Sequence, residues 1–99
     1  MKACIQLKKF ANAREKAYQA VGKMNGKRAK AITKIKLIAG HYARESDMVQ
    51  LRAVNQVQGY IMELLPTAES NFKNQRAEML NLIDQAKSLQ KCTNQTLAY

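Results

Sequence analysis

Apolar residues recur at every third or fourth position along most of this 99-residue chain. An α-helix has 3.6 residues per turn, so this spacing gathers the apolar side chains on one helix face. No segment shows the sustained alternation of Val, Ile and Thr that is typical of a half-buried strand. The sequence therefore predicts an all-α fold, a small bundle or hairpin of three to four helices.

Three breaks interrupt the helical pattern. Asn25-Gly26 is a turn dipeptide, and Pro66 stops a helix because it lacks an N–H. Between residues 42 and 51 the apolar face rotates by more than about 100° relative to a straight helix, and Ser46-Asp47 is a helix-start signal. We expect helices at about 3–23, 27–43, 47–65 and 67–91, with one kinked helix over 27–65 as the alternative.

The length fits a single helical domain over residues 1–91, followed by a flexible tail over 92–99 that is rich in Thr and Asn. The formal charge is +10, and it is distributed unevenly. Residues 1–45 hold 12 Lys or Arg against two Glu, whereas residues 46–91 are neutral, with five of each sign. This asymmetry predicts that the N-terminal half meets a polyanion or an acidic protein.

Few residues could carry catalysis or bind a metal ion. The chain has one His and two Cys, which is too few soft ligands for a tetrahedral zinc site. The only local cluster of mixed chemistry, Glu45 and Asp47 beside His41, is interpreted as a helix linker. Gly26-Lys27 is followed by Arg28 where a phosphate-binding P-loop has Ser or Thr, and no strand precedes it. We expect no enzyme activity, no metal and no cofactor.

Cysteine usage and the N-terminus indicate a compartment. Cys4 and Cys92 are far apart and in no CxxC spacing, which favours two reduced thiols, with a disulfide between the termini as the alternative. Charges appear before any apolar run can form a secretory signal. The longest uncharged run, 53–62, is about half a membrane span. We expect a cytoplasmic protein.

The strongest functional signal is a run of basic residues that leads into the second predicted helix. Lysine outnumbers arginine 12 to 5 in the chain, and lysine contacts phosphate as a point charge rather than reading bases. Charges three or four residues apart on a helix lie about 5–6 Å apart, which is comparable with the phosphate spacing of a nucleic acid. A solvated helix face is the alternative interpretation. The basic ridge consists of Lys23, Lys27, Arg28, Lys30, Lys34 and Lys36.

We therefore expect a small non-enzymatic protein that binds the backbone of DNA or RNA with little sequence specificity. The alternative is a helical adaptor or inhibitor, for example of a phage, plasmid or secretion system, whose basic face docks on an acidic protein. A helix-turn-helix fits poorly because Arg44 and Arg52 fall where apolar residues are needed. A membrane partner is not expected, because segment 27–43 has no Trp or Phe to anchor at the interface.

The C-terminal half supplies a candidate packing seam. Its apolar residues keep a spacing of three or four across the third and fourth predicted helices, which is typical of a helix that packs on a neighbour. The pattern does not decide whether the neighbour belongs to the same chain or to a second copy in a homo-oligomer. The seam consists of Val54, Val57, Ile61, Leu64, Phe72, Met79, Leu82 and Leu89.

Overall fold

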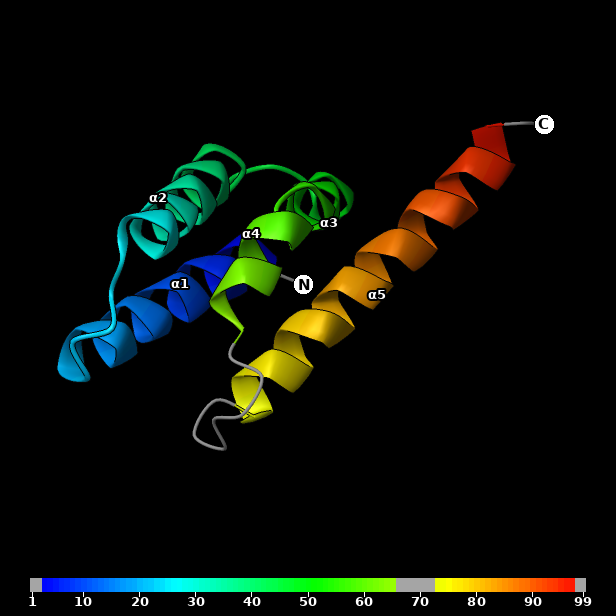
Figure 1. The fold of residues 1–99 in the computed structure, drawn as a ribbon. Helices are drawn as coiled ribbons and strands as arrows, with labels where there is room; N and C mark the ends of the chain where they lie inside the picture. Colours follow the sequence, from blue (N-terminus) through cyan, green and yellow to red (C-terminus); the bar gives the residue numbers. More distant parts are fainter. Residues whose placement is uncertain (1–2, 66–72, 98–99) are drawn as a thin grey trace.

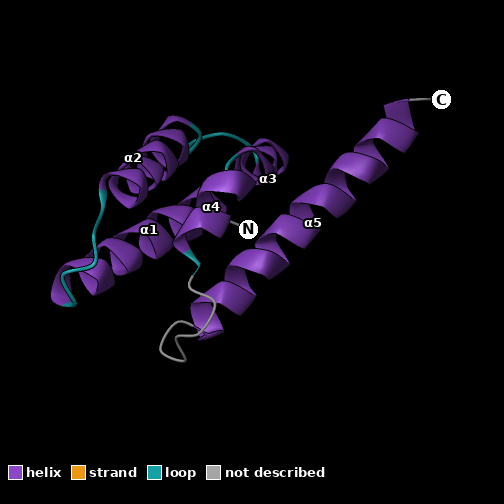
Figure 2. Ribbon diagram, viewed as in Figure 1, coloured by secondary structure: helices purple, strands orange, loops and turns teal. Residues whose placement is uncertain are grey.

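The computed structural model describes residues 3–65 and 73–97, with side chains as far as Ser88 apart from Gln75. Within these ranges the chain is helical and has no strand, which confirms the all-α class (Figures 1 and 2). The helices are α1 (Ala3–Ala20), α2 (Gly26–His41), α3 (Asp47–Gln56), α4 (Gln58–Leu64) and α5 (Lys73–Leu97). The described residues thus form five helices rather than three or four.

The additional helix arises at Val57, where the predicted helix 47–65 divides into α3 and α4. Val57 leaves the helical dihedral range, with φ −92° and ψ 8°, and its N–H donates to the carbonyls of both Ala53 and Val54. The apolar stripe continues through this break, since Val54, Val57 and Ile61 are all buried. Periodicity alone could not reveal the break, because the stripe does not change phase there.

The other boundaries follow from local chemistry. Gly22 adopts φ +68°, and the Lys23 N–H donates to the Tyr18 carbonyl at 2.9 Å, which is a Schellman ending for α1. Asn25 caps α2 by accepting the Arg28 N–H at 2.9 Å. α2 ends before the turn that leads to α3, so the alternative of one kinked helix over 27–65 is wrong.

Ser46 caps α3 by accepting the Val49 N–H at 3.4 Å. Residues 66–72, where the fourth helix was expected to start, lie outside the described residues. α5 continues to Leu97 and so runs into the segment 92–99 expected as a tail.

The helices pack in two main contacts. α1 and α2 lie side by side and antiparallel, while α3 packs on α5 (Figure 1). α4 lies against α2, and α3 also contacts α1, so the two pairs share one core. Each helix contributes fully buried side chains, including Leu7, Ile35, Val54, Ile61 and Ile83.

Six residues of the predicted seam lie in this core. Val54, Val57, Ile61, Leu64, Met79 and Leu82 are each 6% exposed or less. Phe72 lies outside the described residues, and so does the side chain of Leu89. Self-packing of the chain therefore accounts for the described part of the seam, and a homo-oligomer stays a prediction.

A buried Gln50 fixes the turn between α2 and α3. Its side-chain nitrogen donates to the carbonyls of Ala43 at 3.0 Å and Glu45 at 3.1 Å. Its oxygen accepts the Cys4 N–H, one of the first N–H groups of α1 that the helix itself cannot satisfy, at 3.4 Å. One side chain thereby holds the α2–α3 turn against the N-terminal end of α1.

A buried arginine joins α1 to the end of α4. Arg14 is 0% exposed, and its Nε donates to the Leu64 carbonyl at 2.9 Å while Nη2 donates to the same oxygen. The Tyr18 hydroxyl also donates to this carbonyl, at 2.5 Å, and accepts from Nη2 at 3.1 Å. Leu64 is the last residue of α4, where carbonyls lack helical partners and the helix dipole is negative.

The same guanidinium lies over aromatic rings. Its central carbon is 5.1 Å from the ring centre of Tyr18 and 5.8 Å from that of Phe10, both one turn away on α1. Cation–π attraction is stronger where water is excluded. Arg14 thus acts as a C-cap of α4 that is supplied by another helix.

We expect Arg14→Ala to lower the free energy of unfolding by about 3 kcal/mol, because it removes hydrogen bonds to a buried carbonyl and leaves a cavity. Arg14→Lys should also destabilise the fold, since an ammonium cannot reproduce the guanidinium fork. Urea unfolding followed by circular dichroism measures both changes. Arg44→Ala is the control at an exposed arginine and should change stability by less than about 0.5 kcal/mol. An Arg14→Lys variant as stable as wild type would contradict this role.

Cys4 is a free thiol that is 1% exposed near the start of α1. Burial raises its pKa, because the thiolate would lose its hydration. The thiolate is the reactive form of cysteine, so a buried protonated thiol is inert.

We expect iodoacetamide at neutral pH to label Cys4 only after unfolding, as measured by peptide mass spectrometry with and without urea. The raised pKa also has a consequence for stability. An unfolded chain releases this proton at lower pH than the folded chain, so the fold should lose stability as the pH rises above the ordinary cysteine pKa. Rapid labelling of Cys4 in the folded protein would contradict its buried position.

Candidate nucleic-acid interface

The basic ridge lies on α2 and on the loop that leads into it. α2 turns Ala31, Ile32, Ile35 and Ala39 toward the core. Of the ridge residues, Lys23, Lys27, Lys30 and Lys34 are exposed, and Arg28 and Lys36 are half-buried. The residues of the basic ridge therefore differ in exposure, although they form one cluster in the sequence.

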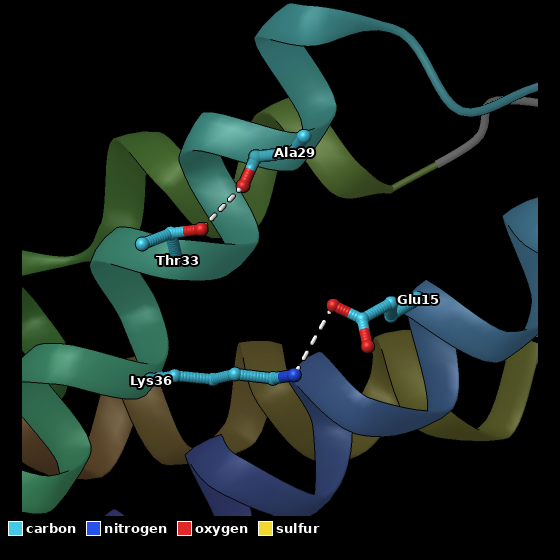
Figure 3. Close-up of polar contacts among 4 residues, drawn as sticks. All are labelled: Glu15, Ala29, Thr33 and Lys36. Carbon is cyan, nitrogen blue, oxygen red and sulfur yellow. Dashed lines mark hydrogen bonds and ion pairs between the residues drawn. The ribbon is translucent and has the colours of Figure 1, made fainter.

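Three ridge residues have partners within the chain. Lys36 Nζ lies 3.1 Å from Glu15 Oε2, which joins α2 to α1 (Figure 3). Lys27 Nζ lies 3.7 Å from Glu63 Oε1 on α4, but the Lys27 side chain is 78% exposed, so this ion pair is weak.

Arg28 is the third of these residues, and it serves the structure. Its guanidinium carbon lies 4.3 Å from the ring centre of Tyr18. Its Nη1 donates to the Lys23 carbonyl at 3.0 Å, and its own N–H is capped by Asn25. Arg28 therefore holds the α1–α2 loop against α1, and its guanidinium is committed to these contacts.

The other three ridge residues, Lys23, Lys30 and Lys34, make no ion pair with any residue in the described ranges. We call these three the α2 row. Lys30 and Lys34 are one helical turn apart, which places their charges about 6 Å from each other along α2. Each ammonium is available to a ligand from solvent.

The surface around the α2 row is poor in groups that read bases. α2 contains no Asn or Gln, and its one Arg is held by Tyr18. Thr33 is exposed, but its hydroxyl donates to the Ala29 carbonyl at 2.9 Å (Figure 3). Leu37, at 64% exposed, is the most exposed large apolar side chain in the described ranges. The surface can attract phosphate, yet it offers little direct base readout.

The structure also shows a shallow hollow of about 150 Å³ between α1 and α5. It is lined by Gln6, Lys9, Phe10, Glu78 and Met79. Drug-sized ligands occupy pockets of roughly 300–1,000 Å³, so this one is too small for a cofactor. The sequence could not predict this hollow, because its two walls come from α1 and α5 and no motif indicates that these helices contact each other.

The cluster of His41, Glu45 and Asp47 lies at the α2–α3 turn, and all three side chains are exposed. The His41 ring contacts the Tyr42 ring edge to face, with centroids 4.8 Å apart. Within the described ranges no group of three or more His, Cys, Asp or Glu side chains is close enough to hold a metal ion.

None of the described helices is both long enough and apolar enough to cross a bilayer. Comparison of the chain with protein-family models, with curated proteins and with solved structures gives no match in any of the three. The function is therefore inferred from the chemistry of the described surface.

Proposed function

We propose that this protein is a non-enzymatic binding protein whose α2 row contacts the phosphate backbone of a nucleic acid with little sequence specificity. The observation that supports this proposal is the exposure of Lys23, Lys30 and Lys34 without a carboxylate partner among the described residues. These lysines belong to the half of the chain that holds the whole net charge of +10. Such a surface attracts polyanions over long range.

Counterion release sets the scale of the expected binding. Each neutralised phosphate contributes about −0.9 to the slope of log K against log salt on duplex DNA, so three contacts give about −3. Non-specific binding of this kind has dissociation constants of about 10⁻⁴ to 10⁻⁶ M at physiological salt. Lys27 adds a weaker contribution because it must leave Glu63 to bind.

A second candidate function is an adaptor or inhibitor that docks on an acidic protein. Leu37 favours it, since an apolar side chain that is 64% exposed beside lysines suits a partner with both acidic and apolar groups. Pull-down from lysate with and without nuclease separates the two functions. A partner that disappears with nuclease supports nucleic acid, and a protein partner that survives supports the adaptor.

We expect the double variant Lys30→Gln and Lys34→Gln to weaken binding to a random-sequence duplex about tenfold at low salt. The slope of log K against log salt should fall by about 2, because two phosphate contacts are lost. Fluorescence anisotropy over a series of salt concentrations measures both quantities. Lys73→Gln with Lys87→Gln is the matched control, since it removes the same charge from exposed sites on α5. Absence of wild-type binding at low salt, or a slope near zero, would contradict the proposal.

A further inference from the structure

The α1–α2 pair carries a second set of exposed lysines that the basic ridge does not include. Lys8, Lys9 and Lys16 are exposed on the side of α1 that faces away from the buried residues Leu7 and Arg14. Lys9 also lines the hollow between α1 and α5, together with Glu78. Like the α2 row, these three make no ion pair with any described residue. We call them the α1 row.

Acidic residues are almost absent from this pair of helices. Glu15 is the only acidic residue on α1, α2 and the loop between them, and Lys36 occupies it at 3.1 Å. Arg14 is buried, and Arg28 is committed to Tyr18 and the Lys23 carbonyl. Apart from Lys27, the open charge of the α1–α2 pair is therefore concentrated in two sets of three lysines, one on α1 and the other on α2 and the loop that leads into it.

The two helices that carry the rows are joined by an ion pair without net charge. Figure 3 shows the Lys36–Glu15 ion pair spanning from α2 to α1, with Thr33 and Ala29 joined by their hydrogen bond on the same side of α2. Packed helix axes lie about 8–10 Å apart. Lysines carried by both helices of an antiparallel pair can thus reach phosphates on both sides of a groove about 12 Å wide.

The same surface lacks the features that single-strand binding uses. Single strands are held by stacking their bases on aromatic side chains. On α1 and α2, Phe10 and Tyr18 are buried in the core, and the exposed His41 ring, at the last residue of α2, contacts the Tyr42 ring. Asn12 and Gln19 are exposed on α1 beside the α1 row, and their amides can donate to phosphate oxygens.

We infer that the α1 row is a second phosphate-binding row and that the nucleic acid is double-stranded, gripped through its backbone by α1 and α2 together. This inference rests on the proposed function, because the α2 row supplies the other half of the contact. Both helices then form the binding surface, and the Lys36–Glu15 ion pair between them contributes no net charge to it.

The test compares three triple variants with equal net charge. The first neutralises the α1 row (Lys8→Gln, Lys9→Gln, Lys16→Gln), the second the α2 row (Lys23→Gln, Lys30→Gln, Lys34→Gln) and the third exposed α5 cations (Lys73→Gln, Arg76→Gln, Lys87→Gln). Each is titrated by fluorescence anisotropy against a random duplex and against a single strand of equal length. Circular dichroism checks that each variant keeps its helicity.

We expect the α1-row variant to bind the duplex at least tenfold more weakly than wild type, with a salt slope reduced by about 3. The α5 variant should bind within about twofold of wild type, and wild type should prefer the duplex to the single strand. An α1-row variant that matches the α5 control would overturn the second row, and a preference for the single strand would overturn the duplex assignment. If the α2-row variant also matches the control, the proposed function itself fails.

Discussion

The hydrogen bonds between the Arg14 guanidinium and the Leu64 carbonyl connect the parts of this small fold. A chain of about 100 residues has a modest core, and its short helix α4 cannot satisfy its own last carbonyls. Arg14 reaches them from α1, and Tyr18 adds a hydroxyl to the same oxygen. The end of α4 is thereby fixed on α1.

Tyr18 connects the Leu64 carbonyl in the core to Arg28 on the basic ridge. Its hydroxyl binds the Leu64 carbonyl inside the core, and its ring lies under the Arg28 guanidinium near the surface. Arg28 in turn holds the Lys23 carbonyl, so the loop between α1 and α2 is tied to the core through one side chain. Part of the charge in the N-terminal half therefore stabilises the structure, and the charge available for binding is smaller than the net +10 suggests.

The sequence could predict the helix class and the breaks at Asn25-Gly26 and Ser46-Asp47, because both depend on residues close together in the chain. The apolar stripe of α2 and the break at Ser46 are as expected. The break at Val57 could not be predicted, since the stripe keeps its phase and no Pro marks the site. Arg14 stands out in the sequence as a polar residue in an apolar stripe, but its partner at Leu64 is 50 positions away.

The sequence could predict where the candidate site lies, but not which of its lysines are free of ion pairs. Clustering of lysines before and along α2 identifies the surface from sequence alone. Which lysines remain open depends on carboxylates from other helices, such as Glu15 beside Lys36 and Glu63 beside Lys27. The sequence does not group the α1 row with the basic ridge, because the two sets of lysines come onto neighbouring helices only when α1 packs on α2.

The central claim is that α1 and α2 form the phosphate-binding surface and that the C-terminal half does not. A nitrogen-15 NMR titration of the protein with a short random duplex at low salt tests this most directly. We predict shift changes concentrated on the amides around the α1 and α2 rows, which reverse when salt is raised, while α5 amides stay unchanged. Shifts centred on α5, or no shifts at all, would contradict the account.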